Sequence, residues 1–287
     1  MLRGTIMLFV VLLSLAVLTS PVLAGVQMEY DLSAEKALCY EYTFREFAGP
    51  DASQLTQADD WWADCQVEIR FDAEGRITIQ LSQLRIADNM ISIDDIKRFS
   101  DVTCTVTAEM DAAGRLENIS DPEVVAVPRE GETKATPEDV LALRGFVWPI
   151  LCRSTELALP DLPPIERGPG QSWRIRKNEW GCHFTNSDRL LPFEFLQVSD
   201  VQDDRIVEIL GGPEHQILPR DLPAPIGIPG VPLSRRQYHA ELSFDLEVKA
   251  IRSARFTKLY ETNSKREGFR NGGIYVAKQV HEITLLE

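Results

Sequence analysis

The chain contains a 13-residue pattern twice, and in both places the pattern is that of a β-hairpin. It reads CQVEIRFDAEGRI at 65–77 and CTVTAEMDAAGRL at 104–116, which begins 39 residues further on. Apolar and polar residues alternate before the turn, as is typical of a strand with one buried face. Asp72 suits the first position of a type I turn, and Gly75 suits the left-handed residue that closes it. The pattern therefore predicts two hairpins in an antiparallel sheet.

The turn at 72–75 fixes the register of the first hairpin. It places apolar residues opposite one another on the same face: Val67, Ile69 and Phe71 opposite Leu81, Ile79 and Ile77. The return strand, expected over 76–86, then changes face, because Leu84 and Ile86 have the other parity. A β-bulge near Ser82 and Gln83 would produce this change and bend the sheet.

The second hairpin, expected over 101–120, has a less regular return strand. The register of the first hairpin would place Glu109 opposite Glu117, and like charges across a strand pair are destabilising. It would also place Asn118 opposite Ala108, on the apolar face. We therefore expect a bulge after Leu116.

The first 24 residues have the features of an export signal. Arg3 gives a positive start, 5–18 is almost entirely apolar, and Val22-Leu23-Ala24 supplies small residues where a signal peptidase cuts. The apolar run is short for a membrane span, and no second run follows it. The sequence therefore predicts a secreted or periplasmic protein with no integral membrane span after cleavage.

The charge of the chain argues against nucleic acid as a partner. Lys and Arg total 30 and Asp and Glu total 44, which gives a net charge of −14. Such a field repels phosphate backbones. The length allows one large or two small domains, each with a proper core.

Five cysteines lie beyond the signal: Cys39, Cys65, Cys104, Cys152 and Cys182. Export permits disulfides, and an odd count leaves at least one free thiol. If their strands flank the return strand of the first hairpin, Cys65 and Cys104 lie about 9–10 Å apart. A disulfide needs Cα atoms within roughly 7 Å, so these two are expected as core residues. Cys152 and Cys182 are the expected disulfide.

A helix and a proline-rich linker divide two β-rich halves. Thr136 as N-cap and Pro137 in the first turn predict a helix, which Pro149 is expected to end. Prolines at 160, 163, 164 and 169 mark the linker. The expected organisation is a signal over 1–24, an N-terminal β half over 25–135, the helix and linker over 136–170, and a C-terminal β half over 171–287.

The fold predicted from these elements is mainly β: curved antiparallel sheet built from meander hairpins, with one apolar helix on the concave face. The N-terminal half adds an aromatic strand within 28–47, and 54–63 and 121–134 are expected as connectors. In the C-terminal half the strands are expected at 173–176, 180–184, 193–198, 205–210, 238–248, 254–262 and 275–283. The proline-rich stretch 218–233 cannot be a central strand.

The sequence contains no recognisable catalytic or metal-binding motif, so we expect no cofactor, no metal and no catalytic residue. The four histidines, His183, His215, His239 and His281, have no metal-ligand spacing on one element. Each is expected at the surface or hydrogen-bonded in the core. His239 lies beside Glu241 on the polar face of its strand, so it is the histidine of greatest functional interest.

Trp61 and Trp62 are the candidate ligand contacts. Neighbouring tryptophans in a polar connector can form the lip of a binding site. They can equally close the open end of the sheet as part of the core, and this second interpretation is the one that we favour.

The run LPDLPPI at 159–165, followed by Gly170-Gln171-Ser172-Trp173, resembles a pattern in exported bacterial proteins of unknown function. In these proteins an LP-x-x-P segment precedes a G-x-S-W that begins a strand. The resemblance implies an envelope protein with a curved antiparallel sheet, loosely similar to the periplasmic lipoprotein carriers. Gly168-Pro169 is inserted relative to the pattern, and no functional residue carries over.

Export, aromatic strands and a covered curved sheet predict a non-catalytic exported protein that binds a hydrophobic small molecule or another envelope component. The alternative is a structural or interaction module that uses the acidic face of the sheet. A secreted hydrolase is the third hypothesis, and it would need a pocket that gathers His239 or His183 with carboxylates.

Overall fold

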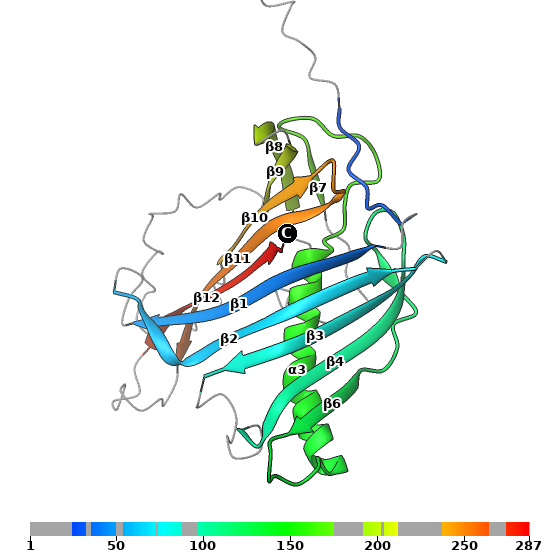
Figure 1. Ribbon diagram of the computed structural model, residues 1–287. Coiled ribbons are helices and arrows are strands. Elements are labelled where there is room, and N and C mark those ends of the chain that lie inside the picture. Colours follow the sequence, from blue (N-terminus) through cyan, green and yellow to red (C-terminus); the bar gives the residue numbers. More distant parts are fainter. Residues whose placement is uncertain are drawn as a thin grey trace, which may run out of the picture.

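In a computed structural model, the strands of this chain form one curved antiparallel sheet around one long helix (Figure 1). This confirms the predicted fold class. The residues that the structure describes are 25–32, 36–49, 54–72, 74–87, 97–174, 192–201, 204–211, 237–263 and 274–286.

The strands follow each other across the sheet almost as they do along the chain. In the first half they are β1 (Ala37–Gly49), β2 (Thr56–Phe71), β3 (Arg76–Ile86), β4 (Phe99–Met110), β5 (Leu116–Glu117) and β6 (Glu123–Pro128). In the second half they are β7 (Ser172–Arg174), β8 (Pro192–Val201), β9 (Asp204–Gly211), β10 (Gln237–Asp245), β11 (Ala250–Asn263) and β12 (Ile274–Leu285). The spatial order is β5-β4-β3-β2-β1-β12-β11-β10-β9-β8-β7, with β6 also paired to β4. Among the described strands this order has two ends, so the sheet is open.

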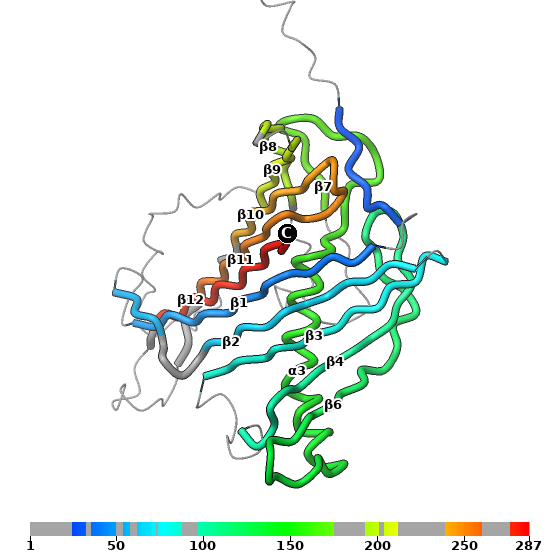
Figure 2. The backbone as a smooth tube through the Cα atoms, viewed as in Figure 1, coloured from blue at the N-terminus to red at the C-terminus, as the bar shows by residue number. Residues whose placement is uncertain are grey.

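The pairing of β1 with β12 unites the two halves in a single sheet. Its register runs without interruption from Tyr40 and Leu285 to Gly49 and Val276. Strands from opposite ends of the chain therefore lie side by side at its centre (Figure 2).

The first hairpin forms as predicted. Phe71 pairs with Ile77, and the two apolar pairs beyond them have the expected register. Gly75 has a φ of 79°. The Asp72 carboxylate accepts hydrogen bonds from the backbone N–H groups of Glu74 and Arg76, each at 2.9 Å. The local turn chemistry and the hydrophobic pattern thus select the same register.

The predicted bulge in β3 is also present. Gln66 pairs with Ser82, whereas Asp64, two residues before Gln66, pairs with Arg85. Gln83 lies within this irregularity and has a φ of 52°. Beyond this point the alternation changes parity, as the sequence indicated.

The irregularity of the second hairpin lies later than predicted. Glu109 and Glu117 do pair, and β5 ends there. Asn118, with a φ of 53°, donates its amide to Glu109 at 2.7 Å, and Arg115 lies 3.2 Å from Glu117. These neighbours offset the like charges, so no bulge is needed directly after Leu116.

Three sequence assignments of loop and strand were wrong. The expected connector at 54–63 belongs largely to β2, which starts at Thr56, and the expected loop at 121–134 contains β6. Pairing with β1 and with β4 satisfies the backbone of these polar stretches, which their side-chain pattern did not reveal. Conversely, β10 ends at Asp245, whose carboxylate accepts from the backbone N–H groups of Glu247 and Val248 at 2.9 Å and closes a turn.

The helix α3 (Pro137–Ala158) starts as predicted but does not end at Pro149. Thr136 and Asp139 form a capping box, with the Thr136 N–H donating to Asp139 at 2.6 Å. A proline inside a helix costs about 3 kcal/mol. The turns after Pro149 bury Ile150, Leu151 and Leu157 almost completely, and each such side chain contributes about 1.5–3 kcal/mol. Burial therefore outweighs the proline.

The helix packs on the concave face of the sheet, which we call the inner face. It contacts β2, β3, β4, β6, β11 and β12, and Figure 1 shows it crossing behind β2, β3 and β4. Residues 25–32 and the linker after α3 continue the cover, since Tyr30 packs edge-on against Phe244 and the Asp161 carbonyl oxygen of the linker accepts from the Trp173 indole N–H at 3.2 Å. Within the described part of the chain, no helix has the length and hydropathy that a membrane span needs.

Candidate functional site

The centre of the inner face carries polar groups among the apolar side chains of the core. The Tyr42 hydroxyl and Nδ1 of His281 share a hydrogen bond of 2.7 Å, although these residues are 239 positions apart. Both are buried, and the Phe44 ring stacks on the imidazole with centroids 4.8 Å apart. Burial lowers the pKa of His281 well below its usual value, and the positive charges of Arg153 and Lys258 lower it further. The imidazole is therefore neutral.

Two further tyrosines are buried near each other, since Tyr40 influences the pKa of Tyr30, and Tyr40 shares the buried face of β1 with Tyr42. Tyr30 donates its hydroxyl to the Pro160 carbonyl oxygen at 3.1 Å. Tyr40 is fully buried, and its hydroxyl has no hydrogen-bond partner among the described residues. Burial raises the pKa of both phenols. A buried polar group without a partner costs about 1–3 kcal/mol, and the Tyr40 hydroxyl is one of the few such atoms among the described residues.

We call Tyr30, Tyr40, Tyr42 and His281 the inner polar cluster. Residues 25–32, β1 and β12 supply its members. Arg153, on the second half of α3, influences the pKa of Tyr42 and of His281, which places the cluster next to that half of the helix. With raised tyrosine pKa values and a lowered histidine pKa, every member is uncharged at neutral pH. General acid–base catalysis favours pKa values near the working pH, so this arrangement suits hydrogen bonding to a ligand better than proton transfer.

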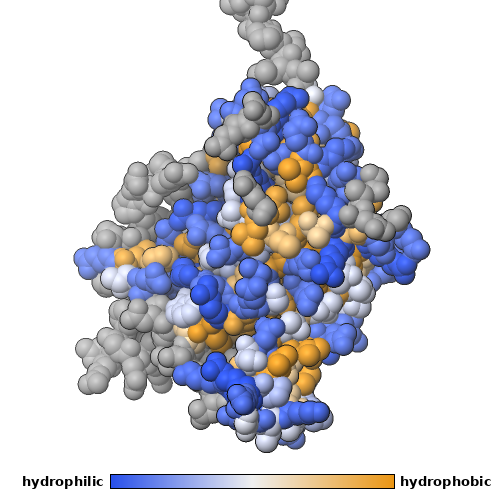
Figure 3. All heavy atoms as spheres, in the orientation of Figure 1, coloured by the Kyte–Doolittle hydropathy of each residue, from blue (hydrophilic) through white to orange (hydrophobic). Residues whose placement is uncertain are grey.

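The opposite, outer face of the sheet is mainly hydrophilic, with hydrophobic side chains between the polar ones (Figure 3). A groove of about 600 Å³, the outer groove, runs across β1, β12, β11, β10 and β9. Its charged lining residues are Glu41, Glu208, Glu241, Arg255 and Glu282. Arg255 lies 3.2 Å from Glu282 and forms an ion pair with it inside the groove.

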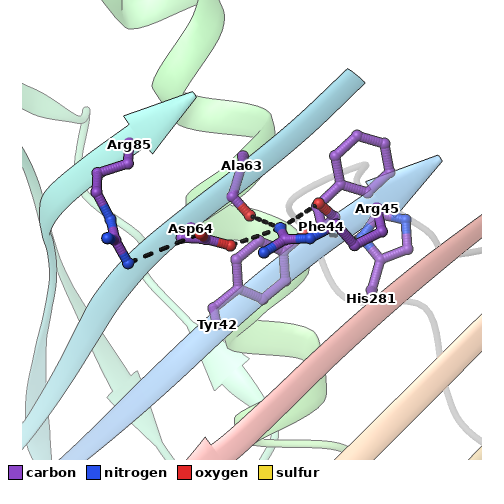
Figure 4. A network of polar contacts seen from close by, with 7 residues as sticks. All are labelled: Tyr42, Phe44, Arg45, Ala63, Asp64, Arg85 and His281. Atoms are coloured by element: carbon purple, nitrogen blue, oxygen red, sulfur yellow. Dashed lines mark hydrogen bonds and ion pairs between the residues drawn. The ribbon is translucent and has the colours of Figure 1, made fainter. Parts of the chain in front are cut away.

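Beside the outer groove, an ion-pair network joins β1, β2 and β3 (Figure 4). Arg45 bonds the Asp64 carboxylate at 2.5 Å and the carbonyl oxygens of Phe44 and Ala63, while Arg85 lies 3.7 Å from Asp64. A second groove of about 500 Å³ adjoins this network, and Glu41 lines both grooves.

The described ones among the predicted site residues are not members of the inner polar cluster. Trp62 is half-buried in register with Arg45, whose guanidinium carbon lies 5.6 Å from the centre of the ring. The Trp61 side chain lies outside the described residues. Cys152 is buried and Cys182 lies outside the described residues, so their disulfide stays a prediction. The ligand contact of the two tryptophans stays a prediction as well.

Two predicted roles of individual residues can be followed in the structure. Cys65 and Cys104 are buried free thiols on β2 and β4, which flank β3, as expected. His239 lies 3.3 Å from Glu241, but it is not among the residues that line the outer groove. Within the described chain, no group of three His, Cys, Asp or Glu residues is placed to hold a metal.

The sequence did not reveal the inner polar cluster. Tyr42 stood out as part of an aromatic strand and His281 as one of four histidines. Their meeting depends on the pairing of β1 with β12, which brings together the two ends of the chain. A weak signal was present, because both residues occupy apolar parities of their strands, where a polar atom needs a partner.

Comparisons with known proteins give a likeness of fold alone. No protein-family model matches the sequence, and no curated protein matches it. A structure titled "Lipid-protein interactions in lipovitellin" is similar over 90% of this chain, with 11% identity and a TM-score of 0.48. This chain spans 26% of the length of that one. A DUF1329 family protein from Desulfovibrio piger is similar over 88% of this chain and 85% of its own, with 8% identity and a TM-score of 0.25.

Proposed function

We propose that this protein is a non-catalytic exported protein that holds a hydrophobic ligand between α3 and the inner face of the sheet. In this proposal the ligand places its apolar part against the aromatic inner face and its polar end at the inner polar cluster. Ligand sites of this kind combine mostly apolar walls with a few polar groups that fix orientation.

The observation that carries the proposal is the Tyr40 hydroxyl. It is fully buried and lacks a partner among the described residues, whereas Tyr30 and Tyr42 beside it are hydrogen-bonded. A hydrogen bond from a ligand would remove the cost of this unsatisfied group. The support comes from the site itself, because structural similarity at a TM-score below 0.5 does not extend to a shared ligand.

Native mass spectrometry of the purified protein, together with titration of a fluorescent fatty-acid probe, tests the proposal. We expect a bound lipid in the first measurement and saturable, displaceable probe binding in the second. Absence of both would refute the hydrophobic-ligand function.

Two tyrosine variants locate the site. Tyr40→Phe removes a hydroxyl that has no described partner, so the free protein should keep its stability or gain some, while probe affinity falls about five- to tenfold. Tyr42→Phe is the matched control, because it removes a hydroxyl bonded to His281 and should lower stability by about 1 kcal/mol. Unchanged probe affinity in Tyr40→Phe would place the ligand elsewhere.

Export is part of the proposal and rests on the sequence of residues 1–24. Its test is the N-terminal sequence of the protein recovered outside the cytoplasm, which should begin at Gly25. A product that begins at Met1 would contradict it.

The outer groove favours the second candidate function, an interaction module. Its lining carries four carboxylates, Glu41, Glu208, Glu241 and Glu282, against one arginine, Arg255. A groove of this charge suits a basic peptide segment of a partner protein, and the attraction would weaken at high salt. A combined Glu41→Gln, Glu208→Gln variant should lose most of the binding of an oligolysine probe. Binding that is equally strong in the variant would rule out this role.

A further inference from the structure

The strand β6 lies at one open edge of the sheet. Among the described strands, β6 pairs with β4 on one side and with none on the other. In Figure 1 it lies at the margin of the sheet, next to the first turns of α3. An exposed strand edge is a template for pairing with another strand.

The backbone of β6 presents its even-numbered residues to this edge. The Arg129 N–H donates to the Arg98 carbonyl oxygen at 2.8 Å, and the Val127 carbonyl oxygen accepts from the Ser100 hydroxyl at 3.2 Å. Odd-numbered residues therefore turn their N–H and C=O groups toward β4. Since these groups alternate sides along a strand, those of Val124 and Ala126 point to the free edge. Pro128 adds a carbonyl and no N–H there.

The side chains of the odd-numbered residues are exposed. Val125 and Val127 are 50% and 47% exposed, which makes them two of the largest apolar side chains in contact with solvent. Glu123 and Arg129 flank them and are exposed too. Glu123 has no ion pair among the described residues, and Arg129 uses its Nε for the Phe99 carbonyl oxygen at 3.2 Å.

This strand is complementary to itself. When two copies lie antiparallel with Ala126 opposite Ala126, Val125 of each faces Val127 of the other, and Glu123 of each faces Arg129 of the other. Opposite charges and β-branched pairs across strands both stabilise an antiparallel ladder. We propose that two copies of this chain pair through β6 about a two-fold axis at Ala126, so that their sheets continue across the interface.

The register also fixes the hydrogen bonds of the interface, including those at the proline. The two Ala126 residues exchange two backbone hydrogen bonds, and each Val124 N–H donates to the Pro128 carbonyl oxygen of the other copy. Pro128 has no N–H to donate in return, so the Val124 carbonyl of the other copy forms no bond in this pair, and the ladder holds four interchain hydrogen bonds in all. Such an isologous contact is closed, so the assembly stops at a dimer and does not grow into a fibre.

Sedimentation velocity of the purified protein over a range of concentrations tests the proposal. We expect a monomer–dimer equilibrium. Ala126→Pro should abolish the dimer while thermal unfolding and circular dichroism stay near those of the parent, because the lost N–H is not used by β4. A monomer at every concentration, or undiminished dimerisation of Ala126→Pro, would overturn it.

A charge exchange keeps the test valid if the proline variant fails to fold. Glu123→Arg and Arg129→Glu alone each place like charges across the interface, and each should weaken the dimer about tenfold. The double variant restores opposite charges and should return the dimer to within about threefold of the parent. Ile165→Lys, at an exposed apolar residue of the linker, is the matched control and should have no effect. Failure of the double variant to restore dimerisation would contradict the register.

Discussion

The two turns of the repeated hairpin have the same local structure in different surroundings. Asp72 accepts hydrogen bonds from two backbone N–H groups, and Asp111 accepts the corresponding two from Ala113 and Arg115 at 3.0 and 2.9 Å. Gly75 and Gly114 have φ values of 79° and 87°. The four-residue sequence Asp-x-x-Gly therefore builds its turn independently of what lies outside it.

The surroundings differ at the glycine. A Cβ on Gly75 would have no heavy atom within 4 Å, whereas one on Gly114 would lie 2.5 Å from a Tyr30 ring carbon and 3.0 Å from the Pro160 carbonyl oxygen. The same tyrosine belongs to the inner polar cluster. The first glycine thus serves the backbone conformation alone, while the second also makes room for residues 25–32 and the linker to cover the inner face.

The largest effect expected from this difference is at Gly114. Gly114→Ala combines backbone strain at positive φ with a collision against a fixed carbonyl, and we expect a loss of about 3 kcal/mol in the free energy of unfolding. Gly75→Ala, the control, should cost about 1 kcal/mol. Denaturant unfolding of both variants measures the difference. Equal losses would mean that Tyr30 and Pro160 do not close over the second turn.

A double-mutant cycle tests whether Tyr30 causes the larger loss. In a Tyr30→Ala background, the cost of Gly114→Ala should fall by about 1–2 kcal/mol, because the ring that meets the new methyl group is gone. The cost of Gly75→Ala should be the same in both backgrounds. Strict additivity at Gly114 would exclude Tyr30 as the obstacle.

The aspartates should behave alike where the glycines do not. Asp72→Ala and Asp111→Ala each remove an acceptor of two exposed backbone hydrogen bonds, so each should cost about 1 kcal/mol. Unfolding midpoints of the two variants should agree closely. A markedly larger loss in one of them would show that the two turns are not locally equivalent.

The smallest expected effect is on the reactivity of the two matching cysteines. Burial raises the pKa of both thiols, to about 11 for Cys104 and further for Cys65. Neither should react with iodoacetamide at neutral pH in the folded protein, whereas the exposed Cys39 should react. Peptide mass spectrometry gives the order of labelling. Rapid labelling of Cys65 would contradict its place in the core.

Local patterns predicted the parts of the fold in which neighbouring residues decide the outcome. The first hairpin, its register, the bulge at Ser82 and Gln83 and the start of α3 at Thr136 all follow from turn residues, parity and capping. The passage of the helix through Pro149 did not follow, because that proline is tolerated through burial of Ile150 and Leu151 against the sheet. The strand β6 was missed for the same kind of reason, since its pairing with β4 gives it its structure.

The candidate site was the least predictable part. Trp61 and Trp62 were predicted as candidate ligand contacts because they are adjacent aromatic residues. Tyr40, Tyr42 and His281 are brought together by the pairing of β1 with β12 and are buried beneath the helix. Short stretches of sequence do not show which distant strands pair, and these two strands are separated by almost the whole chain.

By itself, the sequence determined the hairpins, the alternation of buried and exposed side chains and the cap of the helix, because each depends on residues a few positions apart. The tertiary structure alone decided that the two halves share one sheet, that β6 lies at an open edge and that the Tyr40 hydroxyl is buried without a described partner. These features depend on contacts between distant residues, whose free energy arises from burial and pairing when the whole sheet assembles.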